Sequence, residues 1–171
     1  PDVSAEEAFR LARAMTMKNS AANLPHGGGK SVIFGDPKIE PAKKEQLIRA
    51  FARAIRDLVE YIPGPDMGTD ERCMAWIKDE IGRAVGLPPE IGGIPLDEIG
   101  ATGLGLKASV EAALKYCDFD LKGARVVIQG FGSVGKHAAR FLGEKGTVLV
   151  AASDSRGTIC NPKGIDVARL I

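Results

Sequence analysis

The stretch Arg125-Val-Val-Ile-Gln-Gly-Phe-Gly-Ser-Val-Gly135 decides the fold of the second half of this chain. Its first five residues are rich in β-branched side chains and predict a buried strand, and the glycine-rich turn after them leads into a helix expected at Ser133–Leu142. A further apolar run, Thr147-Val-Leu-Val-Ala-Ala152, predicts a second strand. Because a strand, a helix and a strand in this order form a β-α-β unit, we expect an α/β domain with a parallel sheet.

The turn Gly130-Phe-Gly-Ser-Val-Gly135 has the spacing of a dinucleotide-binding loop. Gly130 permits a tight turn, Gly132 lets the backbone approach a pyrophosphate, and Gly135 lets helix and strand pack closely. The free N–H groups at the start of the helix, around Ser133 and Val134, favour phosphate oxygens. A glycine turn without a ligand is the alternative, and the position between a strand and a helix favours cofactor binding.

An acidic residue follows the second strand, where the ribose of the adenosine would lie. Asp154 stands at the distance from the glycine turn that suits hydrogen bonds to the ribose hydroxyls. A carboxylate at this position favours NAD, whereas Arg156 would suit the 2′-phosphate of NADP. The sequence therefore predicts NAD or NADP as cofactor, with a slight preference for NAD.

In the first half of the chain, the sequence predicts three helices and one short strand. Ser4, Pro41 and Asp70 are expected to begin three helices, the third of which ends near Arg83. The run Ser31-Val-Ile-Phe34 predicts the strand. Residues 85–103 are rich in glycine and proline and predict a connector, after which a helix is expected at Gly105–Tyr116.

Three adjacent glycines precede Lys30 in the segment Leu24-Pro-His-Gly-Gly-Gly-Lys30. Such a run has a high backbone entropy cost, so it usually serves close approach of the chain to another group. Lys30, placed between the glycines and the predicted strand, is a candidate for a partly desolvated amine. Taken alone, the segment is equally compatible with a solvated lysine.

Several segments together resemble the glutamate/leucine/phenylalanine/valine dehydrogenase family, in the order that the family has them. These segments are Met15–Lys18, Leu24–Pro37, Gly64–Thr69, Met74–Ile77, Ala101–Gly103, Gln129–Gly135 and Ser153–Gly157. The resemblance implies a substrate-binding lobe at residues 1–102, lacking its N-terminal part, and a truncated Rossmann-type NAD(P)-binding lobe at residues 103–171. It thus implies an α/β protein and an incomplete member of the family.

The same resemblance implies a role for individual residues. Lys18 would bind the α-carboxylate of an amino-acid substrate, and Lys30 would be the catalytic lysine. Asp66 would carry the proton to and from the amino nitrogen, and Thr102 would lie near the nicotinamide carboxamide. The expected reaction is reversible oxidative deamination of an L-amino acid to a 2-oxo acid and ammonia. Taken without the resemblance, Asp66 is typical of a turn-forming residue after Pro65, and the resemblance favours the catalytic role.

The choice of substrate stays open between glutamate, which is expected first, and a branched-chain amino acid or phenylalanine. Ser31 and Val32 follow the lysine where many glutamate enzymes have glycines, and Met17 replaces the usual aromatic residue. A non-catalytic dinucleotide-binding regulatory protein is a further alternative, although such a protein would need neither Lys30 nor Asp66. An unrelated Rossmann oxidoreductase would leave the glycine-flanked lysine unexplained.

Composition excludes several other classes of protein. The net charge of +1 lacks the basic excess that binding to nucleic acid needs, and no apolar run approaches the ~18 residues of a membrane span. Three separated cysteines and two histidines predict neither a disulfide framework nor a metal site. We therefore expect a cytoplasmic protein with reduced thiols. From the resemblance we expect it to be a homo-oligomer.

Overall fold

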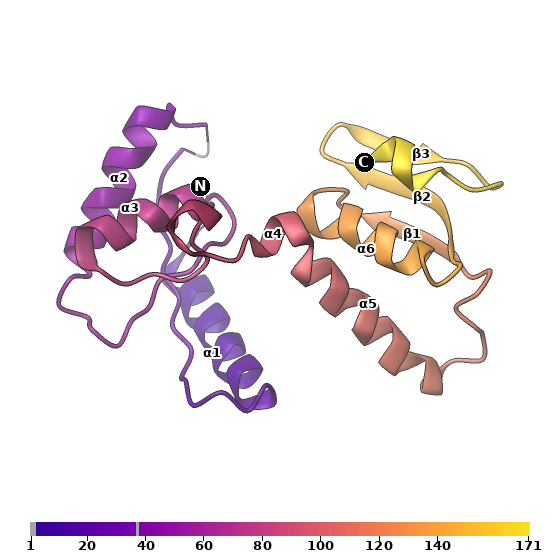
Figure 1. Cartoon of the computed structure of the whole chain (residues 1–171), viewed down its shortest axis with the longest axis horizontal. Helices are drawn as coiled ribbons and strands as arrows, with labels where there is room; N and C mark the ends of the chain where they lie inside the picture. Colours follow the sequence, from indigo (N-terminus) through magenta and orange to yellow (C-terminus); the bar gives the residue numbers. More distant parts are fainter. Residues whose placement is uncertain (1–2, 37) are drawn as a thin grey trace. The chain divides into compact units, whose positions relative to one another are not determined.

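The computed structural model describes residues 3–36 and 38–171. Pro1, Asp2 and Pro37 lie outside the described residues, and Pro37 is the last residue of the segment Leu24–Pro37 that resembles the family. The chain forms two compact units, which divide between Ile94 and Pro95 (Figure 1). This division falls within the predicted connector, but earlier than the expected boundary at residue 102. Thr102 therefore belongs structurally to the second unit.

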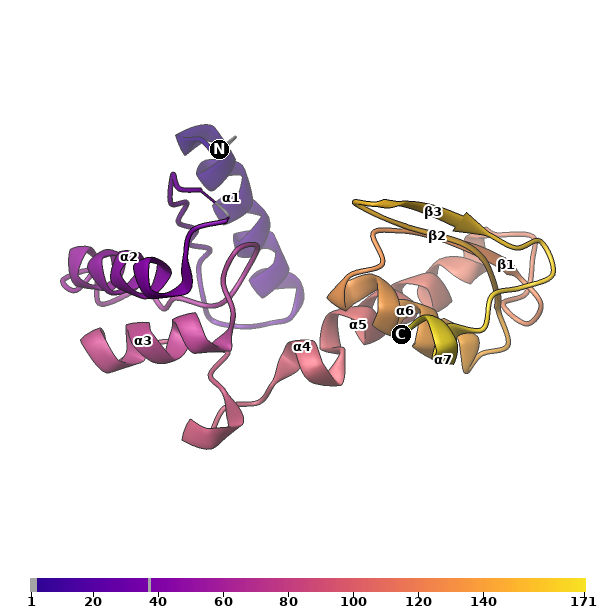
Figure 2. The same cartoon turned by 90° about the horizontal axis from the view of Figure 1, so that it is seen from above.

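The described part of the first unit is helical. It contains α1 (Ala5–Ala21), α2 (Pro41–Ala54), α3 (Glu71–Ile81) and the short 3₁₀ helix η1 (Pro89–Ile91). Helices α2 and α3 lie side by side in both views (Figures 1 and 2). They enclose a core of buried residues, namely Ile48, Ala52, Cys73, Met74 and Ile77.

The three helix starts expected from the sequence are confirmed. The hydroxyl of Ser4 accepts a hydrogen bond from the N–H of Glu7, and Pro41 is the first residue of α2. Asp70 caps α3 by accepting a hydrogen bond from the N–H of Cys73. Helix α3 ends where Gly82 takes a left-handed conformation, so it is slightly shorter than expected.

The strand predicted at Ser31–Phe34 is wrong. The segment has no ladder partner among the described residues, and Phe34 is 76% exposed. Only Ile33 packs against the core of α2 and α3. A strand forms only when it can hydrogen-bond to a neighbouring strand, and the described part of the first unit contains no strand with which Ser31–Phe34 could pair.

The second unit is the expected β-α-β unit with one addition. Its elements are α4 (Leu96–Ile99), α5 (Ala101–Ala113), η2 (Leu114–Tyr116), β1 (Arg125–Gln129), α6 (Ser133–Gly143), β2 (Val148–Asp154), β3 (Gly157–Cys160) and α7 (Val167–Leu170). Strands β1 and β2 are parallel, which confirms the prediction, whereas the unpredicted β3 pairs antiparallel with β2. The order in the sheet is β1-β2-β3.

Helices cover one face of this sheet. Figure 2 shows α6 and α7 on the same side of the strands, and the buried residues Ala139, Leu149 and Ala152 join α6 to β2. Helix α5 packs along α6 and begins at Ala101, earlier than expected. The close contact depends on Gly103, because a β-carbon there would lie 2.7 Å from Cβ of His137. In residues 3–36 and 38–171, no helix has the length and apolarity needed to cross a bilayer.

Candidate functional site

The glycine run before Lys30 lies against helix α1. The N–H of Gly28 donates a hydrogen bond to Oγ1 of Thr16 at 3.0 Å, and the side-chain amide of Asn19 donates to the carbonyl of Gly27 at 2.8 Å. A β-carbon on Gly28 would lie 2.0 Å from the carbonyl oxygen of Ala12, so no other residue fits there without moving the loop. Gly28 is therefore explained by close packing of two backbones.

The next glycine faces an aromatic ring. A β-carbon on Gly29 would lie 2.8 Å from two ring carbons of Tyr61. The backbone of Tyr61 is itself held in place, because the Arg83 guanidinium donates to its carbonyl and to the carbonyls of Ile55 and Leu58. The backbone that leads into Lys30 is thus fixed between α1 and the loop after α2.

Lys30 and Asp66 form an ion pair, with Nζ of the lysine donating to Oδ2 of the aspartate. The lysine side chain is 20% exposed and that of the aspartate 52%. The lysine side chain is thus mostly buried, while about half of the aspartate side chain is exposed. The pair brings together the two residues to which the resemblance assigns proton transfer.

Asp66 is held in place by a turn just before α3. Its other carboxylate oxygen, Oδ1, accepts a hydrogen bond from the N–H of Met67 at 2.7 Å. The hydroxyl of Thr69 lies 2.9 Å from both the N–H and the carbonyl oxygen of Asp66. Because Asp70 begins α3 next to Thr69, the turn is anchored on a helix whose inner face is buried.

The Asp70 cap has an electrostatic signature. Partial burial would raise the pKa of this carboxyl, but the hydrogen bonds from Cys73 outweigh burial, so the pKa lies below its usual value. Burial raises the pKa of the Cys73 thiol. The aspartate is therefore ionised and the thiol protonated near neutral pH, as a helix cap over an apolar core requires.

Lys18 lies in the last turn of α1 and is exposed. Among the described residues its side chain forms no ion pair, unlike that of Lys30. It follows Thr16 along the same helix, and Thr16 holds the glycine run. Its role as a carboxylate-binding residue stays a prediction.

In the second unit the glycine turn is bound to the end of β2. The N–H groups of Gly130 and Phe131 both donate to the carbonyl of Ser153, at 2.9 and 2.8 Å. Gly130 has φ +87°, a conformation that favours glycine. Ser153 immediately precedes Asp154, so the glycine turn and the predicted ribose-binding carboxylate belong to one hydrogen-bonded structure.

The other two glycines of the motif differ in their surroundings. A β-carbon on Gly135 would lie 2.1 Å from the carbonyl oxygen of Gly130, whereas one on Gly132 would have no heavy atom within 4 Å. Gly135 is needed for helix and strand to pack, as the sequence predicts. Gly132 borders open space at the start of α6.

The start of α6 has no side-chain cap. Gly132 occupies the cap position, and the first backbone hydrogen bond back to it comes from the N–H of Lys136. The hydroxyl of Ser133 points to the carbonyl of Asp97 at 3.4 Å, and the Val134 side chain is 41% exposed. The first-turn N–H groups that precede Lys136 have no acceptor within the helix, as suits an anion.

Asp154 forms an ion pair with Arg156, and the sequence motif did not predict this pair. Oδ2 of Asp154 accepts hydrogen bonds from Nε and Nη2 of Arg156, at 3.0 and 2.8 Å. Oδ1 accepts from the N–H groups of Arg156 and Gly157, at 2.8 and 3.2 Å. The hydrogen bonds from the Arg156 backbone and then from its side chain hold the pKa of Asp154 below its usual value.

Thr102 lies in the first turn of α5 and is exposed. Helix α5 packs along α6, so Thr102 shares the second unit with the glycine turn. The residue is thus carried by the same unit as the other predicted cofactor residues, and its contact with a nicotinamide ring stays a prediction.

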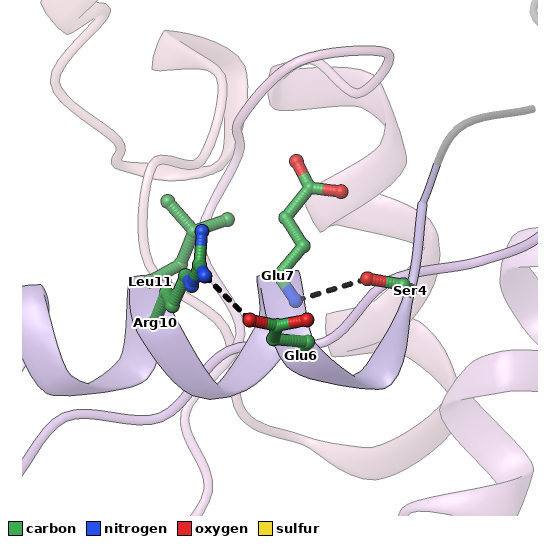
Figure 3. A pocket seen from close by; sticks show the side chains of 5 residues that line it. All are labelled: Ser4, Glu6, Glu7, Arg10 and Leu11. Atoms are coloured by element: carbon green, nitrogen blue, oxygen red, sulfur yellow. Dashed lines mark hydrogen bonds and ion pairs between the residues drawn. The ribbon is translucent and has the colours of Figure 1, made fainter.

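A hollow over the start of α1 contains none of the predicted site residues. Figure 3 shows that it is lined by Ser4, Glu6, Glu7, Arg10 and Leu11. All five belong to one helix start, where the Ser4 hydroxyl caps Glu7 and Arg10 pairs with Glu6. None of the five is a residue that the sequence predicts for the site, so the hollow adds nothing to it. Within the described residues, no cluster of His, Cys, Asp or Glu is arranged to hold a metal ion.

Comparison with known proteins accounts for both units. Residues 1–83 match the family model described as "Glu/Leu/Phe/Val dehydrogenase, dimerisation domain", and residues 92–171 match "Glutamate/Leucine/Phenylalanine/Valine dehydrogenase". A glutamate dehydrogenase of Aeropyrum pernix is 41% identical over 97% of this chain, and glutamate dehydrogenase A2 of Halobacterium salinarum 42% identical over 98%. The chain spans 43% of the length of each.

Solved structures agree with the sequence relatives. The hetero-hexameric glutamate dehydrogenase of Thermus thermophilus, in a leucine-bound form, has a TM-score of 0.90 and 36% identity, covering 99% of this chain and 44% of its own. Glutamate dehydrogenase of Peptoniphilus asaccharolyticus has a TM-score of 0.75 and 31% identity, covering 99% of this chain and 47% of its own. Since the two models together match almost every residue, this chain belongs to the glutamate/leucine/phenylalanine/valine dehydrogenase family.

Proposed function

We propose that this chain forms the catalytic centre and part of the cofactor site of an NAD(P)-dependent amino-acid dehydrogenase. The reaction is the reversible oxidative deamination of an L-amino acid, glutamate first, to a 2-oxo acid and ammonia. The observation that carries the proposal is the Lys30–Asp66 ion pair beside a glycine run that is fixed against α1. Glutamate is favoured because the relatives named above are glutamate dehydrogenases.

The two paired residues divide the proton transfers of this reaction. A bound nicotinamide would accept hydride from the α-carbon of the amino acid. Asp66, whose side chain is half exposed, takes the proton from the amino nitrogen and returns it in the reverse direction. Lys30, shielded from water, assists the attack of a water molecule on the imine carbon and stabilises the product of that attack. Lys18 binds the substrate α-carboxylate through its ammonium group.

The cofactor residues fit a dinucleotide. The open space beside Gly132 leaves room for a pyrophosphate, and the uncapped first turn of α6 offers N–H donors to it. Asp154 would face the adenosine ribose, and Thr102 the nicotinamide carboxamide. Either NAD or NADP satisfies these contacts.

We further propose an oligomeric protein of the cytoplasm. One matched family model is described as a dimerisation domain, and the Thermus thermophilus relative is a hetero-hexamer, so subunits of this family assemble. Cys73, Cys117 and Cys160 form no disulfide in the part of the chain that the structure describes. Free thiols are typical of a reducing compartment.

The test is turnover of the protein that contains this chain, followed as absorbance of the reduced nicotinamide with a panel of amino acids. We expect Lys30→Ala to lose turnover by several orders of magnitude and still bind cofactor. Lys30→Arg fails as well, because a guanidinium group keeps its protons in a protein and therefore cannot take part in proton transfer. Lys43→Arg, on the exposed face of α2, is the matched control and keeps full activity. Near-normal turnover of Lys30→Arg would show that Lys30 acts only as a positive charge, and the proposed proton-transfer mechanism would be overturned.

A further inference from the structure

Arg83 binds the loop that leads from α2 to Asp66 at three points. Its Nε donates a hydrogen bond to the carbonyl of Tyr61 at 3.0 Å, and Nη2 donates to the carbonyls of Ile55 and Leu58 at 2.7 and 2.9 Å. Nε and Nη2 lie on one edge of the planar guanidinium, so the three carbonyls converge on that edge. The N–H of Tyr61 also donates to the carbonyl of Leu58, which closes the loop into a turn beside the arginine.

The segment that Arg83 begins continues along the same loop. The N–H of Val85 donates to the carbonyl of Pro63 at 2.9 Å, and Pro63 is buried. Gly86 has φ +67°, and a β-carbon on it would lie 2.5 Å from Cδ of Pro65. The segment thus supports the loop as far as Pro65, and the proposed catalytic aspartate follows directly.

The same loop also supports the lysine. The side chain of Tyr61 lies against Gly29, since two of its ring carbons would be 2.8 Å from a β-carbon added there. Gly29 immediately precedes Lys30, whose amine pairs with Asp66. One arginine therefore holds a loop that reaches the residue before each member of the ion pair, Gly29 through the ring of Tyr61 and Pro65 along the chain.

We propose that Arg83 is a positioning residue for the Lys30–Asp66 pair, acting through Tyr61 and the loop that carries it. The inference rests on the proposed function, because it assumes that this pair performs the proton transfers. A guanidinium offers several donors in a fixed fork, whereas the ammonium group of a lysine is a single point and cannot occupy the positions of both Nε and Nη2. Loss of the fork lets the loop shift, and a misplacement of about 1 Å between reacting groups costs roughly a hundredfold in rate.

The experiment measures turnover of glutamate by the protein that contains this chain, as Arg83→Lys and as wild type. We expect kcat to fall roughly tenfold to a hundredfold while KM for the amino acid stays within about twofold, because the proposed carboxylate ligand Lys18 lies on α1 and not on this loop. The solvent deuterium isotope effect on kcat should increase, because the slowed steps are proton transfers. Arg56→Lys, which changes an exposed arginine of the same loop, is the matched control and keeps the wild-type kcat.

Two changes at Tyr61 test the route of the effect. Tyr61→Ala removes the ring that lies against Gly29 and should lower kcat with the same rise in the isotope effect. Tyr61→Phe keeps the ring and should recover most of the turnover lost in Tyr61→Ala. Because Arg83 acts partly through Tyr61, combining Arg83→Lys with Tyr61→Ala should lower kcat by less than the product of the two single effects.

The outcomes separate positioning from a purely structural role. If Arg83→Lys lowers kcat only in proportion to the folded fraction, measured by thermal unfolding, and keeps the wild-type isotope effect, Arg83 only stabilises the fold and the inference is wrong. Wild-type kcat together with a wild-type isotope effect in Arg83→Lys would overturn it as well. If Arg83→Lys does not fold, the two Tyr61 variants decide in the same way.

Failure of the proposed function gives a different result. If Lys30→Ala keeps its turnover, the ion pair performs no chemistry and both proposals fall together. An inactive Lys30→Ala beside a normal Arg83→Lys would leave the proposed function standing and refute the role of Arg83 alone.

Discussion

Replacing Gly135 by alanine should break the packing of α6 on β1, whereas the same change at Gly132 should leave the fold intact. At Gly135 the added β-carbon would lie 2.1 Å from the carbonyl oxygen of Gly130 and 3.1 Å from Cγ2 of Ile128. The first neighbour is backbone and belongs to a turn already bound to Ser153, so it cannot move cheaply. Overpacking of this kind costs about 1–3 kcal/mol.

The expected change is large on the scale of a small domain. A loss of 1 kcal/mol lowers the melting temperature of a 60–100-residue domain by roughly 4–8 °C, so Gly135→Ala should lower that of the second unit by roughly 5–20 °C. Gly132→Ala meets no heavy atom within 4 Å and has an extended backbone that alanine adopts readily, so its melting temperature should stay within about 3 °C of wild type.

The assay is a thermal unfolding scan by circular dichroism, paired with a titration of NADH on each variant. We expect Gly132→Ala to melt like the wild type and to bind NADH at least roughly tenfold more weakly, since its methyl group enters the space proposed for the pyrophosphate. The reasoning is refuted if Gly135→Ala melts normally, because the backbone contact would then be absent. Normal binding by Gly132→Ala would remove the phosphate-binding role of the turn.

Two more predictions concern the first unit. Asp70→Ala should destabilise α3 by about 1 kcal/mol at neutral pH, while Asp70→Asn keeps the cap. Because folding lowers the pKa of Asp70, the stability that its ionised form contributes is complete above about pH 4 and is lost as the pH falls through the folded pKa. Melting curves of the two variants, recorded over a range of pH, measure this loss. Gly28→Ala should lower both the melting temperature and turnover, because its β-carbon would lie 2.0 Å from the Ala12 carbonyl oxygen. Gly27→Ala is the control and should melt normally, because its β-carbon would have no heavy atom within 4 Å. Equal melting temperatures of the two variants would show that the loop does not lie against α1.

Elements with local signals were predictable from the sequence. Strand β1 has the predicted bounds, and α6 extends one residue further than expected, because a β-branched run and a glycine turn specify them without distant partners. The caps at Ser4 and Asp70 are equally local. The strand prediction at Ser31–Phe34 was wrong for the opposite reason. A strand needs a second segment to pair with, and the local sequence pattern does not show whether one is present.

The start of helix α5 is determined by its packing on α6 and not by the helix propensity of its residues. Gly103 and Gly105 lower the helix propensity of its first turns, so the sequence predicts a later start. In the fold Gly103 is buried against α6, and its lack of a side chain allows this contact. The strand β3 was missed because Gly157-Thr-Ile-Cys160 is short and exposed, and pairing with β2 alone defines it.

The candidate site divides in the same way. The meeting of Lys30 with Asp66 followed from the resemblance to a family, and the structure brings the two side chains together. The residues that hold them were not found, because Thr16 and Thr69 act through hydrogen bonds whose partners depend on where each loop lies. The sequence predicts Asp154 and Arg156 as separate cofactor ligands, whereas in the structure the two side chains bind one another.

The glycines themselves contain information that a motif does not. Among the described residues, Gly27 and Gly132 are the only glycines outside helices that have neither a positive φ nor a heavy atom within 4 Å of an added β-carbon. The fold therefore does not require glycine at either position, and an alanine there would even reduce the entropy of the unfolded chain. One stands at the start of the run that leads to Lys30, and the other at the start of α6. Glycine without a structural reason, beside residues proposed for substrate and cofactor, is what a surface kept clear for ligands requires.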